Sequence, residues 1–160
     1  MVTGRWVRPG EDIAPALAVR RAVFVDEQGF AAENEVDAFD PLSWHMVLWE
    51  TERPVATGRI YWHAGDFHIG RVCVLHDRRG TGLGDLLMRL LLCKALDHSA
   101  RNVVLAAQVQ AMGFYAKYGF APEGPRYEEE GGLHQTMRTK AGDIRLDHPC
   151  QNATPSSNLA

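Results

Sequence analysis

The spacing of apolar residues changes along the chain, and each change predicts a different structural element. Short or alternating apolar runs predict strands at residues 5–8, 45–49, 55–63 and 67–75. Short turns, Glu52-Arg53-Pro54 and Ala64-Gly65-Asp66, separate the last three of these runs. Strands joined by such turns pair with their chain neighbours, so this part of the sequence predicts an antiparallel meander.

Other segments repeat their apolar residues at the period of a helix. Three helices are predicted in this way, at residues 11–25, 82–96 and 111–118. The third is expected to end at Gly119, because a glycine readily takes the left-handed conformation that closes a helix. Between the second and third helices, the apolar run 102–107 predicts a buried strand parallel to the strand at 67–75.

The remaining segments are polar. Residues 26–42 predict an acidic loop whose length exceeds that of a usual connection, which favours a functional role. Two closing strands are expected on either side of residues 128–132. Beyond Gly142 the periodicity ends, so the sequence predicts one domain at 1–142 and a disordered C-terminal tail at 143–160.

Composition narrows the classes of function. The chain has 160 residues, is 46% hydrophobic and carries a net charge of −3, as expected of one domain with its own core. It has no basic stripe for nucleic acid and no apolar run of the ~20 residues that span a membrane, so neither partner is expected. Cys73, Cys93 and Cys150 lack the paired spacing of a metal site or disulfide framework. We therefore expect a cytoplasmic protein without a bound metal.

A glycine-rich turn, Arg79-Gly80-Thr81-Gly82-Leu83-Gly84, connects the strand at 67–75 to the leucine-rich helix. Backbone N–H groups at such a helix start, together with the helix dipole, favour an anion. The spacing is not that of a P-loop, because no lysine follows until Lys94, nor of G-x-G-x-x-G, because Asp85 and Leu87 stand at the third glycine position. Spacing alone also allows a tight turn without a ligand.

Several motifs resemble those of the GNAT superfamily of acetyltransferases. The turn matches Q/R-x-x-G-x-G/A after a strand, and residues 113–120 are similar to the family's F-Y-x-x-x-G-F stretch. Residues 20–29, 35–40 and 132–138 resemble the ElaA-type branch, so that the likeness covers about residues 5–140. It implies an α/β (α+β) GNAT fold: a mixed, largely antiparallel sheet of six to seven strands flanked by helices, splayed between the strands at 67–75 and 102–107.

The resemblance implies an acetyl-CoA-dependent N-acetyltransferase, in which a primary amine of a small molecule or peptide attacks the thioester directly. Tyr115 stands at the family's acid position, whereas Tyr118 is expected to pack in the core. Cys73 is expected to bind through its backbone, because its surroundings show no base to make it a nucleophile. The residues expected to bind the cofactor are Val72, Cys73, Val74, Arg79, Gly80, Thr81, Gly82, Leu83, Gly84, Asp85 and Gln108.

The acceptor side is less specific. The acidic residues of the 26–42 loop are expected to attract a cationic amine. Histidines on neighbouring strands have the chemistry of a general base, and relay of the proton through water is an alternative. The candidate substrate residues are Glu35, Asp37, His45 and His134. The sequence leaves open a non-catalytic acetyl-CoA sensor, a transferase of longer acyl groups, and a monomer or a homodimer.

Overall fold

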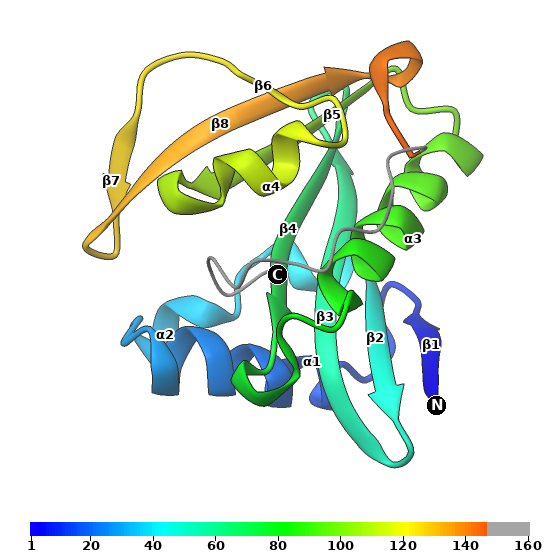
Figure 1. Ribbon diagram of the computed structural model, residues 1–160, viewed down its shortest axis with the longest axis vertical. Helices are drawn as coiled ribbons and strands as arrows, with labels where there is room; N and C mark the ends of the chain where they lie inside the picture. The colour runs from blue at the N-terminus through cyan, green and yellow to red at the C-terminus, as the bar shows by residue number, and fades with distance from the viewer. Residues whose placement is uncertain (147–160) are drawn as a thin grey trace.

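A mixed sheet runs through the part of the chain, residues 1–146, that the computed structural model describes (Figure 1). Its strand order is β1-β2-β3-β4-β5-β8-β6, with β7 also paired to β8, and the only parallel neighbours among them are β4 and β5. The strands are β1 (Val2–Val7), β2 (Trp44–Glu50), β3 (Arg53–His63), β4 (Asp66–Val74), β5 (Asn102–Gln108), β6 (Ala121–Pro122), β7 (Tyr127–Glu129) and β8 (Gly132–Lys140). The predicted meander and fold class are confirmed, the two closing strands are β7 and β8, and the short β6 brings the sheet to eight strands.

The sheet opens between its two parallel strands. Only residues 67–69 of β4 pair with residues 103–105 of β5, so β4 has no strand partner on this side beyond Ile69 (Figure 1). The register of β3 and β4 also shifts between Thr57 and Arg59, and Arg71 in β4 has a backbone φ of 51°. These irregularities bend β4 away from β5. The predicted splay is therefore present, with an open backbone edge along the second half of β4.

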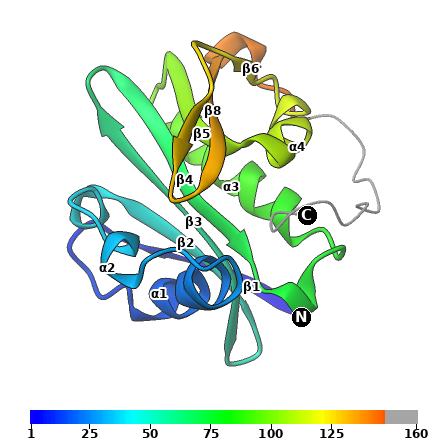
Figure 2. The same cartoon turned by 90° about the vertical axis from the view of Figure 1, so that its left-hand side faces the viewer.

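Helices cover both faces of the sheet, with α1 and α2 on one side and α3 on the other (Figure 2). The helices are α1 (Ala14–Arg20), α2 (Ala32–Glu35), α3 (Leu83–Asp97) and α4 (Met112–Ala116). The first begins later than predicted: the Asp12 carboxylate accepts a 3.0 Å hydrogen bond from the Ala14 amide, an alternative to helical pairing at this end. It also continues further than predicted, as a π-helical segment at Arg21–Glu27.

The segment predicted as an acidic loop is more structured than expected. It contains the end of the π-helical segment, the short helix α2, and a 3₁₀ turn at Asp40–Leu42. Glu35 and Asp40 within it are buried. Carboxylates are buried in proteins only when they are paired, and that pairing, described below, gives this segment its order.

The main core lies between α3 and the sheet. Leu87, Met88, Leu91 and Leu92 of α3 are fully buried there. Gly58 of β3 lets the helix approach, because a Cβ at this position would lie 2.8 Å from the Leu91 Cδ1 atom. A second, smaller core under α1 contains Val19, Val23, Phe24 and Cys73. The sheet is thus fixed to helices on both faces, and its opening lies between the two cores.

The packed part of the chain continues past the boundary predicted at Gly142. Ile144 and Leu146 are partly buried against the main core, and the Arg145 amide donates a 2.9 Å hydrogen bond to the Tyr118 carbonyl. The start of the predicted tail is therefore ordered, because its two apolar side chains have a surface to cover. The rest of the predicted tail, 147–160, lies outside the described residues. Within residues 1–146 no helix is long and apolar enough to cross a membrane.

Candidate functional site

The glycine-rich turn forms an amide-lined start to α3. Gly80 and Gly82 have φ values of 76° and 85°, in the left-handed region that glycine tolerates. The first α-helical bond that closes onto the turn is donated by the Leu86 amide to the Gly82 carbonyl, at 3.0 Å. The amides of Leu83 and Gly84 precede it and have no partner within the helix. A Cβ placed on Gly82 would meet no atom within 4 Å, so this side of the turn faces open space suited to an anion.

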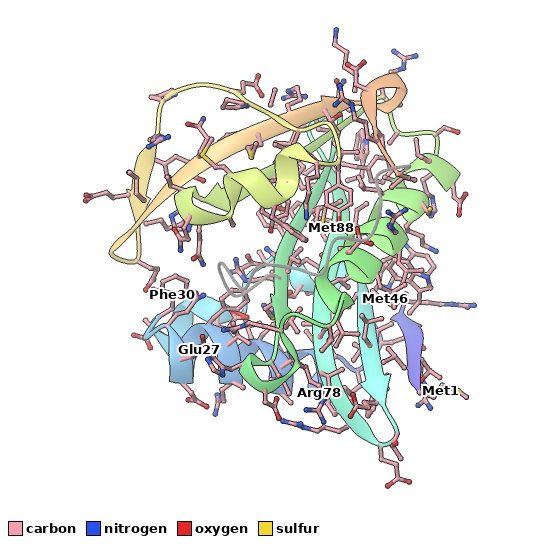
Figure 3. All side chains as sticks on the ribbon, in the orientation of Figure 1. Met1, Glu27, Phe30, Met46, Arg78 and Met88 are labelled. Atoms are coloured by element: carbon pink, nitrogen blue, oxygen red, sulfur yellow. The ribbon has the colours of Figure 1, made fainter. Side chains whose placement is uncertain are left out.

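Two residues expected to bind the cofactor instead use their side chains to hold this turn. The Arg79 guanidinium donates two 2.6 Å hydrogen bonds to Glu27 and a third, at 3.1 Å, to the Val74 carbonyl. Figure 3 labels Glu27 on the helical segment beside the turn. The Asp85 carboxylate accepts hydrogen bonds from the Tyr118 hydroxyl and the Arg89 guanidinium. The side chains of Arg79 and Asp85 therefore position the turn. Any contact of these two residues with a phosphate would have to come from their backbone groups.

The open edge of β4 contains the next three candidates, Val72, Cys73 and Val74. All three side chains are buried. Cys73 packs in the small core, and burial raises the pKa of its thiol, so the sulfur remains protonated and unreactive. Burial of the thiol therefore disfavours a nucleophilic role for Cys73. Along the open edge that faces β5, β4 can therefore contact a ligand through its backbone N–H and C=O groups.

A pocket opens where β4 and β5 separate. The stacked rings of Phe24 and Phe30 line it from the helical side, with centroids 6.2 Å apart. Apolar strand residues, among them Ile69, Val72 and Leu105, line it from the sheet. Its polar lining comes from α2, β4, β5, α4, β7, β8 and the β7–β8 turn, and comprises Asn34, Glu35, Arg71, Gln108, Tyr115, Glu129, Glu130 and His134. Segments far apart in the sequence thus surround one space beside the open strand edge.

Five predicted site residues line this pocket together: Glu35, Val72, Gln108, Tyr115 and His134. Tyr115 is 5% exposed, and burial raises its pKa, so the hydroxyl keeps its proton at neutral pH. Within residues 1–146 that hydroxyl makes no hydrogen bond. Gln108 is more engaged than expected: its amide donates to Gln28 at 3.0 Å and accepts from Gln110 at 2.6 Å. A contact between Gln108 and a ligand would have to exchange one of these bonds.

The acidic segment contributes to a buried ion-pair network. Arg20 contacts both Glu35 and Asp40, with a 2.7 Å distance between its Nη1 and the Asp40 Oδ1. Arg59 contacts Asp40 at 2.8 Å and Asp37 at 2.6 Å. Arg71 then bridges Asp37 and Glu35, at 3.2 and 3.3 Å. Three guanidinium groups therefore balance three carboxylates, and their network joins α1, α2, β3 and β4.

This network pairs Glu35, Asp37 and Asp40 with arginines, so these three carboxylates have little free charge with which to attract a cationic acceptor. Burial alone would raise the pKa of Asp40, but hydrogen bonding and the charge of Arg20 outweigh it and hold that pKa well below its ordinary value. The pKa of Asp37 is lowered in the same way by Arg59. These carboxylates are ionised, and their charge is neutralised by arginines of the same chain. The sequence signal for this pairing was Arg20, a charged residue at the helical spacing of the apolar residues of α1. The structure buries it fully.

His45 is not a pocket residue. It is 1% exposed, its Nε2 lies 3.1 Å from the Asp40 carbonyl oxygen, and burial lowers its pKa. Its place in the interior beside the network removes it from the acceptor side. Of the four candidate substrate residues, the structure thus brings Glu35 and His134 to the pocket and leaves His45 and Asp37 outside its lining.

A contact across the pocket mouth was not anticipated. The Glu130 carboxylate accepts hydrogen bonds from the Ala31 amide, at 3.2 Å, and from the Asn34 side chain. Glu130 lies in the β7–β8 turn with a φ of 53°, and its side chain contacts the segment at 31–34. No local sequence pattern pairs residues so far apart. Glu130, a non-glycine residue before Gly131 in a tight turn, was the feature of the sequence that marked this turn as unusual.

Comparison with known proteins gives a consistent result. Residues 20–141 match the model of the acetyltransferase (GNAT) domain family. The uncharacterized N-acetyltransferase YjcF of Bacillus subtilis is 39% identical over 110 residues, which cover 69% of this chain and 79% of that protein. Protein ElaA of Escherichia coli is 35% identical over 127 residues, covering 76% and 82% of the two chains.

Solved structures share this architecture. The crystal structure of Escherichia coli ElaA has a TM-score of 0.79 and 30% identity, over 88% of this chain and all of that one (100%). A crystal structure of an acyl-CoA N-acyltransferase from Pseudomonas aeruginosa has a TM-score of 0.77 and 28% identity, over 86% of this chain and 99% of that one. The overall fold of this chain is therefore shared with these proteins.

Proposed function

The chain belongs to the GNAT acetyltransferase family, and from this premise we propose that it transfers an acetyl group from acetyl-CoA to a primary amine. The acceptor is a small molecule or a peptide, and the amine attacks the thioester directly in a ternary complex. One observation carries the proposal: the open edge of β4 leads in the chain to the amide-lined turn, and the pocket that contains Tyr115 lies beside the same edge.

The chain offers groups that fit each part of the donor. Amides at the start of α3, beside Gly82, suit the pyrophosphate, because they point positive dipole ends into open space. The backbone of β4 beyond Ile69 can pair with the amide groups of the pantetheine arm in place of the missing strand. When bound, acetyl-CoA supplies an acetyl group already activated as a thioester.

The pocket residues would act on the proton and charge balance of the transfer. Tyr115 lies in the pocket with its proton retained by burial, so it can donate a hydrogen bond or a proton to the leaving sulfur. A backbone N–H of β4 can stabilise the oxyanion that forms at the carbonyl carbon. The stacked Phe24 and Phe30 rings give the pocket an apolar wall, which would favour aminolysis of the thioester over hydrolysis by reducing the access of water.

The proposal is tested by measuring thiol release from acetyl-CoA with a panel of polyamines, amino sugars, amino acids and peptides. We expect thiol release above the amine-free rate with at least one class, and a mass increase of one acetyl group on that amine. A control without amine measures thioester hydrolysis. Binding of acetyl-CoA by calorimetry without acetylation of any amine would contradict the enzyme and support an acetyl-CoA sensor instead.

A further inference from the structure

His134 occupies a central position on the acceptor side of the pocket. It lies on β8, in register with Gln108 of β5 and Tyr127 of β7. Its side chain is 8% exposed and lines the same pocket as Tyr115. The Tyr127 ring stacks on the imidazole with centroids 5.8 Å apart and planes 21° from parallel. The ring is therefore held in a defined orientation beside the proposed acceptor.

The hydrogen bonding of His134 determines which ring nitrogen carries the proton. Its Nδ1 lies 3.0 Å from the Gly132 carbonyl oxygen. A carbonyl oxygen only accepts hydrogen bonds, so in this contact Nδ1 is the donor and carries the hydrogen. In the neutral ring Nε2 then has a lone pair. Within residues 1–146 Nε2 makes no hydrogen bond. This nitrogen remains accessible to solvent.

Most other acid–base groups of the region are already engaged. The oxygens of Glu35 contact Arg20 and Arg71. Glu130 accepts its hydrogen bonds from the segment at 31–34. Glu129 lies on an exposed strand, where water solvates its carboxylate. His134 thus combines a position in the pocket, a fixed ring and a basic nitrogen without a partner.

We propose that His134 is the general base that deprotonates the acceptor amine; this inference rests on the proposed acetyl transfer. The Nε2 lone pair takes a proton from the bound ammonium group, which frees the nitrogen lone pair. That lone pair forms the C–N bond at the thioester carbonyl carbon, and the C–S bond then breaks with its electron pair on sulfur. Sulfur takes the Tyr115 hydroxyl proton, and the second nitrogen proton restores Tyr115. His134 releases its proton to solvent, so one proton leaves per turnover.

The tautomer provides a test that does not depend on activity. In the full-length protein labelled with ¹⁵N-histidine, the spectrum of a His134→Gln variant identifies the His134 signals among those of the seven histidines. At a pH where the ring is neutral, we expect ¹⁵N shifts that show the hydrogen on Nδ1. Shifts showing hydrogen on Nε2 in the neutral ring would overturn the inference, because that nitrogen could not then accept a proton.

The kinetic test uses His134→Gln and His134→Ala with the amine that the parent protein acetylates. We expect kcat to fall by roughly a hundredfold in both, with unchanged affinity for acetyl-CoA, and added imidazole to restore part of the rate to the alanine variant. His63→Gln is the matched control, because this exposed histidine on β3 packs against Phe39 outside the pocket.

The two possible failures are distinguishable. An active parent with an equally active, correctly folded His134→Gln variant would remove His134 as the base and leave the proposed function intact. A parent that acetylates no amine would remove the proposed function and, with it, the role of His134. A reduced rate in both variants without rescue by imidazole would assign His134 to binding rather than to proton transfer, and would also overturn the inference.

Discussion

Gly82 and Gly10 share a backbone conformation but differ in place. Their φ values are 85° and 86°, and a Cβ on either would meet no atom within 4 Å. Substitution strains the backbone similarly at both positions. Only Gly82 lies at the start of α3, where a side chain would fill the space proposed for phosphate. Comparing substitutions at the two glycines therefore separates the effect of backbone strain from the effect on ligand binding.

Gly82→Val should weaken acetyl-CoA binding at least tenfold, equivalent to about 1.4 kcal/mol or more. Isothermal titration calorimetry measures this change. Gly10→Val is the control, and we expect it to lose similar stability and to bind acetyl-CoA as the parent does. Equal affinities for Gly82→Val and the parent would contradict the assignment of the turn to the cofactor.

Tyr115→Phe removes one hydroxyl group from the pocket. We expect kcat to fall by roughly a hundredfold with little change in the Kd of acetyl-CoA, because the ring remains and only the donor is lost. Steady-state thiol release and calorimetry measure the two quantities. Tyr61→Phe serves as the control, since that ring stacks on Phe39 outside the pocket. Unchanged turnover of Tyr115→Phe would exclude the hydroxyl from the mechanism.

At the scale of elements, the ion-pair network connects α1, α2 and the sheet. Asp40 is its centre, because it contacts both Arg20 and Arg59 and is 3% exposed. Removing one partner of such a buried network leaves an arginine charge without full compensation. The geometry of α2, and with it one wall of the pocket, depends on this balance.

Asp40→Asn should lower the free energy of unfolding by about 3–5 kcal/mol. The folded-state pKa of Asp40 lies below its value in the unfolded chain, about 3.9. Its stabilisation is therefore complete above that pH and decreases as the pH falls toward the folded-state value. Denaturant unfolding at pH 7 and pH 3 should show a smaller pH effect in Asp40→Asn. Asp77→Asn, at an exposed ion pair with Arg53, should change little.

The contact of Glu130 with α2 joins the β7–β8 hairpin to the other wall of the pocket. Glu130→Ala removes both hydrogen bonds to the segment at 31–34. We expect KM for the amine to rise several-fold and acetyl-CoA affinity to stay the same, because the contact lies on the acceptor side. Glu128→Ala is the control, on the same hairpin but outside the pocket lining. Equal KM values for the two variants would show that the contact does not shape the acceptor site.

At the scale of the whole molecule, the end of the described chain packs back on the main core. Ile144 and Leu146 cover apolar surface beside α3 and α4. The backbone of residues 145 and 146 also bonds to Tyr118 and Arg89. This segment therefore belongs to the folded domain, and it helps to position the Tyr118 that bonds to Asp85 at the turn.

A chain ending at residue 142 should be less stable than one ending at residue 146, by about 2 kcal/mol, because burial of two aliphatic side chains is lost. Urea unfolding of the two truncated proteins measures the difference. Both lack residues 147–160, so the comparison isolates residues 143–146. Equal stability would place the boundary of the domain at Gly142, as the sequence predicted.

Local pattern was sufficient for most of the elements. Alternation and helical period predicted β2, β3, β4, α3 and β5 to within a few residues, because these segments each present one apolar face to a core. Glycine spacing and the resemblance located the turn at Gly80–Gly84. The start of α1 was predicted wrongly, since Asp12 offers an alternative partner to the backbone there.

The sequence by itself determined the meander and the glycine-rich turn before α3, because these depend on periodicity and on backbone geometry over a few residues; its resemblance to the GNAT family added the fold class and the splay of the sheet. Tertiary structure decided which charges are free. It paired the acidic segment with Arg20, Arg59 and Arg71, engaged Arg79 with Glu27, and set the tautomer of His134. These outcomes depend on contacts between side chains that only the folded sheet brings together, and no local spacing encodes them.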